Sequence, residues 1–259
     1  MNRHFGKCAL CKKEGELTFE HIPPRAAFNS HPAKPVSWES LVKREKGVPW
    51  DITGLPYQNQ QKGMGLYSLC KICNSNTGSW YGEAYRVFSE RVAYLATNYI
   101  NPNYHSVEIK DMYPLHICKQ VISMFCSVNP NVKIDDLREF VLEKEAVGID
   151  KDKYKLCMYF TRSNVKRFNG LSTSMDIEEK SLFVFSEITA YPLGFLLYFD
   201  PDEKQKYKGV DITAFANYKY DDICTIRMPI HFYEVNNWLP LDYRSKAEIL
   251  GVDQSDKQD

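Results

Sequence analysis

The sequence predicts an α+β protein with a small metal-stapled unit at its N-terminus and an antiparallel, strand-rich C-terminal half. Three observations carry this prediction. Two Cys-x-x-Cys pairs lie within the first 73 residues. Apolar side chains recur at helical spacing between residues 80 and 126. Segments rich in aromatic and β-branched residues, bounded by turn residues, follow from residue 154 onward.

The composition is that of an ordinary globular chain, long enough for one large domain or two modest ones. The 259 residues carry 33 basic and 33 acidic side chains, which argues against a basic nucleic-acid coat protein. Residues 1–86 hold 12 Lys and Arg against 7 Asp and Glu. This excess of basic side chains is suited to contacts with phosphates, but a difference of this size also arises from ordinary variation in composition. No apolar run approaches membrane-spanning length and the N-terminus has no signal-like segment, so we expect a cytoplasmic protein without a membrane partner.

The eight cysteines divide into two groups. Four of them form the two Cys-x-x-Cys pairs, which match the ligand count of a closed, tetrahedral structural Zn²⁺ site: Cys8, Cys11, Cys70 and Cys73. Redox-active thiols are the alternative, but they would need a thioredoxin-like βαβ context that is absent here. The other four lie among apolar residues, and we expect them to be small, buried, hydrophobic side chains: Cys118, Cys126, Cys157 and Cys224.

Short secondary-structure signals surround the cysteine pairs. Residues 17–19 and 65–69 are β-prone, and a helix follows the second pair, with an apolar stripe from Trp80 to Leu95. Residues 29–63 are rich in proline and glycine and indicate a long irregular insertion. We expect Trp38 and Trp50 to anchor this insertion to the protein surface.

The remaining chain predicts a helical connector followed by an antiparallel sheet. Helices are expected over 115–126 and 134–145, and strands over 154–161, 182–189, 195–200, 212–220 and 225–233. We therefore divide the chain into an N-terminal module, residues 1–100, and an α+β accessory domain, residues 101–259. Substrate choice, dimerisation or docking of a regulatory partner are the roles open to the second domain.

A distinctive order of motifs connects the cysteine pairs. Glu20-His21-Ile22-Pro23 lies between them, and Asn74 directly follows the second pair. This order resembles the HNH endonucleases, the ββα-metal or His-Me finger family, in members that carry a zinc knot of four cysteines. The resemblance covers about residues 8–90, and it implies an N-terminal ββα-metal module that contains the zinc.

The resemblance also implies roles for individual residues. Glu20 corresponds to the acidic ligand of a catalytic Mg²⁺ or Mn²⁺, His21 to the general base, and Asn74 to a second ligand of that ion. The chemistry is consistent, because histidine titrates near neutral pH and carboxylate and amide oxygens are the ligands that hard divalent ions prefer. Three basic side chains are weaker candidates for nucleic-acid contacts: Arg25, Lys62 and Lys71.

One position departs from the family pattern. The middle Asn, which orients the catalytic His, would fall near Gly65, where no Asn stands. Asn59, a backbone carbonyl or another group must take that role. Two hypotheses follow: an endonuclease, with DNA the first candidate substrate and RNA not separated from it, or an inactive zinc module that recognises nucleic acid or a protein partner. The resemblance also suggests prokaryotic restriction or anti-phage defence, and a homodimer or a regulatory partner is compatible with either hypothesis.

Overall fold

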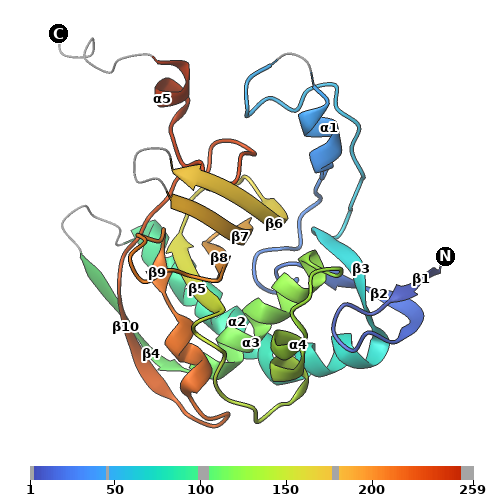
Figure 1. Cartoon of the computed structure of the whole chain (residues 1–259), viewed down its shortest axis with the longest axis vertical. Coiled ribbons are helices and arrows are strands. Elements are labelled where there is room, and N and C mark those ends of the chain that lie inside the picture. The colour runs from blue at the N-terminus through green and yellow to red at the C-terminus, as the bar shows by residue number, and fades with distance from the viewer. Residues whose placement is uncertain (1–2, 45–46, 99–104, 177–180, 252–259) are drawn as a thin grey trace.

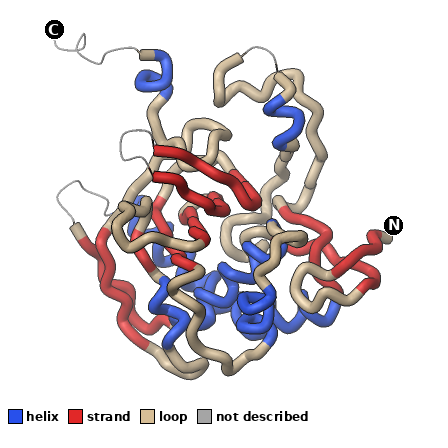
Figure 2. The backbone as a smooth tube through the Cα atoms, viewed as in Figure 1, coloured by secondary structure: helices blue, strands red, loops and turns tan. Residues whose placement is uncertain are grey.

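The computed structural model describes residues 3–44, 47–98, 105–176 and 181–251. Within these ranges the chain combines helices with antiparallel sheets, so the predicted α+β class is confirmed. The longer helices lie together in the lower middle of the molecule with strands beside and above them, and the short helices Trp38–Val42 and Lys246–Leu250 lie at its upper end (Figure 1; Figure 2). None of the helices formed by these residues is long and apolar enough to cross a membrane.

The N-terminal sheet is antiparallel, in the order β1-β2-β3. Its strands are β1 (His4–Lys7), β2 (Glu14–His21) and β3 (Gly65–Cys70), and helix α2 (Lys71–Asn98) follows β3 without a linker. The β-prone runs 17–19 and 65–69 lie inside β2 and β3. Strand β1 was not expected, because its four residues are mostly exposed and carry no hydrophobic alternation.

The insertion between β2 and β3 is mostly irregular, as predicted. It contains one short helix, α1 (Trp38–Val42), whose N-cap Ser37 accepts a hydrogen bond from the Ser40 backbone N–H. The Trp38 ring packs edge-on against Trp238, with 5.4 Å between the ring centroids. The insertion is therefore fastened to the C-terminal half of the chain.

Helix α3 (Pro114–Val128) lies at the centre of the hydrophobic core, and all but the last of its residues are buried. A helix that is buried on every side needs packing partners on every side, and the Lys119 ammonium within it donates to the Phe140 carbonyl over 2.7 Å. Helix α2 and helix α4 (Asp135–Leu142) pack against it, and so does the 3₁₀ turn η1 (Thr213–Asn217). The predicted helices 115–126 and 134–145 correspond to α3 and α4.

The strand-rich half forms two antiparallel sheets. Five strands follow the order β6-β7-β8-β5-β9: β5 (Tyr154–Phe160), β6 (Arg167–Asp176), β7 (Ser181–Ala190), β8 (Leu193–Phe199) and β9 (Val210–Asp211). Two further strands pair with each other, β4 (Ser106–Met112) and β10 (Cys224–Pro229).

One strand prediction was wrong. Residues 212–220 form no strand and contain the turn η1 at Thr213–Asn217, because local side chains cap the backbone there. The Asp211 carboxylate accepts a hydrogen bond from the Thr213 N–H, and the Thr213 hydroxyl accepts one from the Leu156 N–H. These bonds end β9 after two residues and turn the chain back toward α3. The aromatic residues of this segment contribute to packing and do not belong to a paired strand.

The core is continuous across the predicted domain boundary at residue 100. One hydrophobic cluster contains Cys8 and Leu10 from the N-terminal module and Phe195 and Leu197 from the sheet. Arg138 crosses the same boundary with its buried guanidinium, whose Nε donates to the Ala9 carbonyl oxygen over 2.8 Å. The two halves therefore share one interior.

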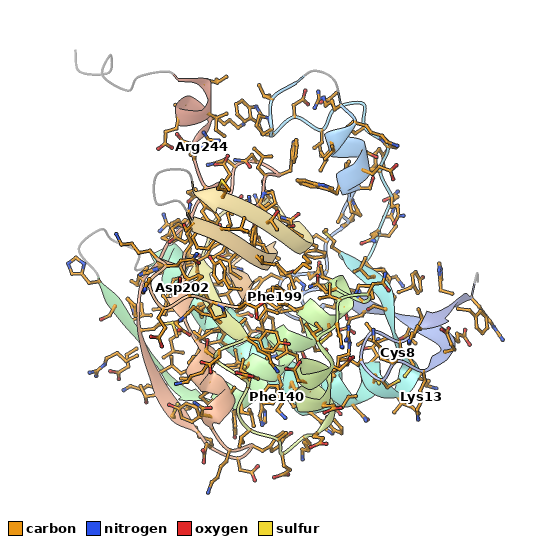
Figure 3. The ribbon with its side chains drawn as sticks, viewed as in Figure 1. Cys8, Lys13, Phe140, Phe199, Asp202 and Arg244 are labelled. Carbon is orange, nitrogen blue, oxygen red and sulfur yellow. The ribbon has the colours of Figure 1, made fainter. Side chains whose placement is uncertain are left out.

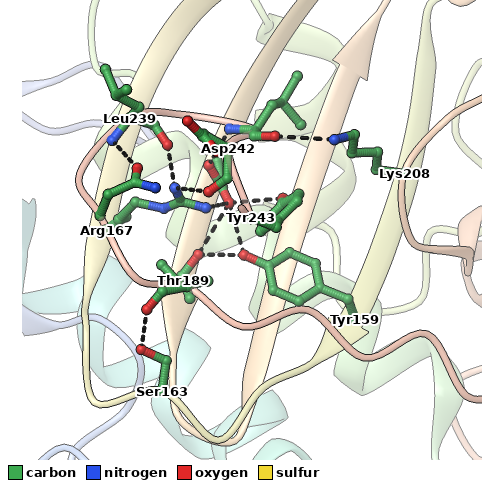
Figure 4. A network of polar contacts seen from close by, with 12 residues as sticks. Tyr159, Ser163, Arg167, Thr189, Lys208, Leu239, Asp242 and Tyr243 are labelled. Atoms are coloured by element: carbon green, nitrogen blue, oxygen red, sulfur yellow. Dashed lines mark hydrogen bonds and ion pairs between the residues drawn. The ribbon is translucent and has the colours of Figure 1, made fainter. Parts of the chain in front are cut away.

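A buried ion pair fixes the five-stranded sheet to the segment that follows β10 (Figure 4). Arg167 on β6 contacts Glu187 on β7 over 2.6 Å, and both side chains are almost completely buried. The hydroxyls of Tyr159 and Tyr243 also donate to Glu187 Oε1, over 2.7 and 3.0 Å. The carboxylate is thereby fully hydrogen-bonded, which is the condition under which a buried charge is tolerated.

Replacing Arg167 by Met should lower the free energy of unfolding by about 3–5 kcal/mol, because Glu187 would keep a buried charge without its cation. Arg244→Met is the matched control, since the Arg244–Asp242 pair spans 2.7 Å but its arginine is 59% exposed. We expect Arg244→Met to lower the free energy of unfolding by less than about 1 kcal/mol. Denaturant unfolding measures both, and equal losses would contradict a special role for the buried pair.

Candidate functional site

The four predicted zinc ligands converge at the corner between the N-terminal sheet and α2, where Figure 3 labels Cys8. The Sγ atoms of Cys8, Cys11, Cys70 and Cys73 all lie within 4.8 Å of one another. The Sγ atoms of Cys11 and Cys70 are 3.9 Å apart. Zn–S bonds of about 2.3 Å in a tetrahedron place sulfurs about 3.8 Å apart, so the cluster could hold a metal such as zinc.

Backbone hydrogen bonds hold the two cysteine turns against each other. The Ala9 N–H donates to the Ser68 carbonyl over 2.8 Å, and the Cys70 N–H donates to Cys8 Sγ over 3.3 Å. A hydrogen bond from the Cys73 thiol, helped by the Cys70 N–H, holds the pKa of the Cys8 thiol below its ordinary value, and the same hydrogen bond raises the pKa of Cys73. A low thiol pKa favours the thiolate, which is the form of cysteine that binds a metal.

A second candidate site lies next to this cluster, where β2 ends against the first turn of α2. Asn74 Nδ2 donates to Thr18 Oγ1 over 2.9 Å and to the Phe19 carbonyl over 3.3 Å. These bonds use the amide nitrogen of Asn74. Among the described residues none hydrogen-bonds to Asn74 Oδ1, so this oxygen is available as a ligand.

His21 is the last residue of β2, and its ring is oriented by a backbone carbonyl. Its Nε2 lies 3.1 Å from the carbonyl oxygen of Lys62. Because a carbonyl only accepts, Nε2 must carry the proton and Nδ1 is left free to accept one. Burial lowers the pKa of His21, and the Arg25 charge lowers it further, against the raising effect of the Lys62 carbonyl. The imidazole is therefore neutral at physiological pH.

Glu20 precedes His21 and is deeply buried, with 7% of the residue exposed. No hydrogen bond to its carboxyl group is found within the described ranges. This desolvation raises the pKa of Glu20 to about 8. A buried carboxylate without compensation is costly, and a bound cation would supply that compensation. The residues present at this position thus fit a divalent ion.

Asn29 ties the end of β2 to the segment that carries the Lys62 carbonyl. Its buried amide donates to the carbonyls of Pro23 and Met64, each over 2.7 Å, and its Oδ1 accepts from the Met64 N–H over 2.8 Å. Gly63 allows this approach, because it has φ +107° and a Cβ there would lie 1.9 Å from the Asn29 carbonyl oxygen. No sequence motif pointed to Asn29 or Gly63.

The three basic candidates for nucleic-acid contacts, Arg25, Lys62 and Lys71, are all exposed. Arg25 is close enough to His21 to affect its pKa, and Lys62 contacts His21 through its main chain. Lys71 is the first residue of α2, on the second cysteine turn. Asn59, considered above as the partner of His21, is exposed, and Lys62 takes the orienting position.

The cysteines are the only group of three or more His, Cys, Asp or Glu side chains that could share one ion in the part of the chain that the structure describes. A catalytic ion would thus have a single carboxylate ligand, Glu20. Comparison of the chain with protein-family models, with curated proteins and with solved structures gave no match.

Cys8→Ser should abolish stoichiometric zinc binding and lower the melting temperature, because three thiolates cannot close the tetrahedron. Cys224→Ser is the matched control, since Cys224 is a half-buried cysteine outside the cluster. Metal analysis of the purified proteins should give one zinc per chain for the control and the native protein. Equal zinc contents in all three would refute the assignment.

Glu20 should make the folded protein less stable as pH rises when no divalent ion is bound beside it. A folded pKa of about 8, above the ordinary value of 4.5, means that the folded state retains a proton that the unfolded state has lost. The contribution of Glu20 is therefore complete below pH 4.5 and decreases between pH 4.5 and 8, by at most about 1.4 kcal/mol per pH unit.

Glu20→Gln removes this titration while keeping the shape of the side chain. Unfolding of both proteins is followed from about pH 5 to 9 in buffer without added divalent ions, with the structural zinc left in place. The stability of the native protein should fall relative to the variant as pH increases. Parallel pH profiles would show that Glu20 is not buried as a protonated acid.

Proposed function

We propose that the protein is a divalent-metal-dependent endonuclease that hydrolyses phosphodiester bonds, with DNA as its first candidate substrate. The observation that supports this most directly is the state of His21. Its Nε2 is held by the Lys62 carbonyl, its Nδ1 is free, and its pKa is lowered by burial. A neutral imidazole fixed in one tautomer at the edge of a basic surface is suited to general-base catalysis.

The proposed reaction assigns one task to each residue. Nδ1 of His21 takes a proton from a water molecule, whose oxygen forms a new bond to phosphorus while the opposite P–O bond breaks. Glu20 and Asn74 Oδ1 would hold Mg²⁺ or Mn²⁺, which stabilises the charge that develops on the leaving oxygen. Thr18 and the Phe19 carbonyl position Asn74 through its Nδ2, so that Oδ1 stays free.

The geometry places one requirement on the substrate. Successive side chains of a strand face opposite sides, so Glu20 and His21 diverge within β2. The proposed reaction therefore requires the scissile phosphate to bind at the end of the strand. Arg25 and Lys62 are exposed next to His21 and would attract the phosphate backbone.

A non-catalytic zinc module that binds nucleic acid or a protein partner is the second candidate. The absence of the middle Asn of the HNH motif favours it, since that residue is replaced by a main-chain contact. A nuclease is compatible with the missing Asn, because the Lys62 carbonyl gives His21 the same tautomer that a side-chain acceptor would give. A role in restriction or anti-phage defence rests on the motif resemblance alone.

His21→Ala should lower the rate of plasmid cleavage in Mg²⁺ or Mn²⁺ by at least about a hundredfold, because the general base is lost. His105→Ala is the matched control, since His105 is exposed and lies outside the site. Both variants should melt at the temperature of the native protein. An RNA of the same sequence is tested in parallel to identify the substrate.

The outcomes separate the two candidates. Cleavage by the native protein and the control, but not by His21→Ala, would establish the nuclease and its base. Equal cleavage by all three proteins would place the activity elsewhere or in a contaminant. Nucleic-acid binding without cleavage by any of them would favour the non-catalytic module.

A further inference from the structure

A large cavity of about 810 Å³ lies between the insertion and the C-terminal half. Its walls come from residues within 28–41, 49–52 and Met64 on one side, and from residues within 164–169, Tyr191 and residues 236–238 on the other. In Figure 1 the insertion with α1 stands opposite the edge strand β6. The volume is within the range of about 300–1,000 Å³ that is typical of small-ligand sites. The proposed reaction does not use this cavity.

Aromatic rings dominate two places on its walls. Trp38 packs edge-on against Trp238, and Phe28 packs edge-on against Tyr191, each pair with centroids 5.4 Å apart. In each pair one ring comes from the insertion and the other from the C-terminal half. Trp38 and Phe28 remain 49% and 39% exposed. Exposed aromatic rings are the side chains on which unstacked nucleobases stack.

The polar side chains that line the cavity indicate which kind of ligand it binds. Asn237 is 1% exposed, and its Nδ2 finds no hydrogen-bond partner among the described residues. Asn169 Nδ2 is also without a partner there. Both residues line the cavity, and their amide nitrogens would meet acceptors such as the ring nitrogens and carbonyl oxygens of a base once the side chains turn toward it.

The charge of the cavity is positive. Lys34 and Lys166 line it, and none of the described lining residues is Asp or Glu. Lys166 Nζ donates to the neutral Asn29 amide over 3.0 Å, and burial lowers the pKa of this lysine. A half-buried ammonium with only a neutral partner is stabilised by an anion. A phosphate attached to the bound base would supply one.

The cavity adjoins the candidate catalytic site. Met64 lines the cavity, and its carbonyl accepts from the N–H of Ile22, the residue after His21. Asn29 contacts both Met64 and Lys166, so one buried amide joins the cavity wall to the end of β2. A nucleotide in the cavity would therefore lie next to a phosphate at His21.

We propose that this cavity binds one unstacked nucleotide of the nucleic-acid substrate, with the base against Trp38 and Trp238 and the phosphate near Lys166. The inference rests on the proposed function in one respect, namely that the substrate is a nucleic acid. It adds that the protein recognises an unpaired or extruded base next to the bond that it cuts. Paired duplex without such a base should bind more weakly.

The test uses the full-length, zinc-containing protein without added Mg²⁺ or Mn²⁺, so that no substrate is cleaved. Fluorescence anisotropy measures the Kd for a labelled single-stranded DNA decamer and for an abasic decamer with the same phosphates. We expect the native protein to bind the intact decamer at least about fivefold more tightly, a change typical of one stacked base.

Two variants and two matched controls locate the binding. Trp38→Leu should remove most of the preference for the intact decamer, and Lys166→Gln should weaken binding of both decamers at least about threefold. Phe5→Leu and Lys204→Gln are the controls, since both residues are exposed and lie outside the cavity. All variants should keep the native melting temperature, because Trp38 is half exposed and Gln can keep the bond to Asn29.

Three results would overturn the inference. Equal Kd values for the two decamers in the native protein would exclude a base pocket. Effects of the controls equal to those of Trp38→Leu and Lys166→Gln would place the binding elsewhere. Displacement of the decamer by free dTMP or AMP at equal molar concentration would show that the occupant is a free nucleotide.

The same experiment keeps the two proposals distinguishable. Plasmid cleavage without a preference for the intact decamer would refute the cavity inference and leave the nuclease standing. A preference for the intact decamer without cleavage in Mg²⁺ or Mn²⁺ would support the cavity inference and refute the nuclease. Failure of the protein to bind either decamer would overturn the cavity inference and its premise of a nucleic-acid substrate.

Discussion

The meeting of two cysteine turns is the constraint on which the rest of the N-terminal structure depends. Fifty-eight residues separate Cys11 from Cys70, and closing so long a loop has an entropic cost that a three-stranded sheet cannot easily offset. Metal binding of the kind that the cluster could support contributes roughly 10–16 kcal/mol in small zinc peptides. Because Cys70 ends β3 and Cys73 lies in the first turn of α2, the same cluster also fixes the strand–helix junction that carries Asn74.

The insertion takes part in both the site and the cavity. Its return segment supplies the carbonyl that orients His21, while its outward segment supplies Trp38 to the cavity wall. Asn29 is the connection between them, since its amide contacts the strand end, the return segment and Lys166. The insertion has little regular secondary structure, but main-chain and amide hydrogen bonds hold it in one arrangement.

The sequence predicted the parts of this structure that depend on local patterns. The cysteine spacing anticipated the cluster, and helical periodicity anticipated α2, α3 and α4. It did not anticipate β6, which contains few aromatic residues and is held in the sheet by pairing with β7. The Lys62 carbonyl could not have been identified either, because every residue has one and only the fold selects which carbonyl reaches His21. The cavity depends on segments that lie far apart in the chain, for which a single sequence carries no signal.

The hydrogen bond from Arg138 to Ala9 has a consequence for how this chain can be divided. The guanidinium that supports the first cysteine turn belongs to α4, more than a hundred residues downstream. During synthesis the N-terminal turn therefore lacks its full support until α4 has emerged. A fragment ending at residue 100 would also leave the inner face of α2, with Tyr81 and Phe88, open to water. The N-terminal residues 3–98 therefore depend on the rest of the chain for their packing.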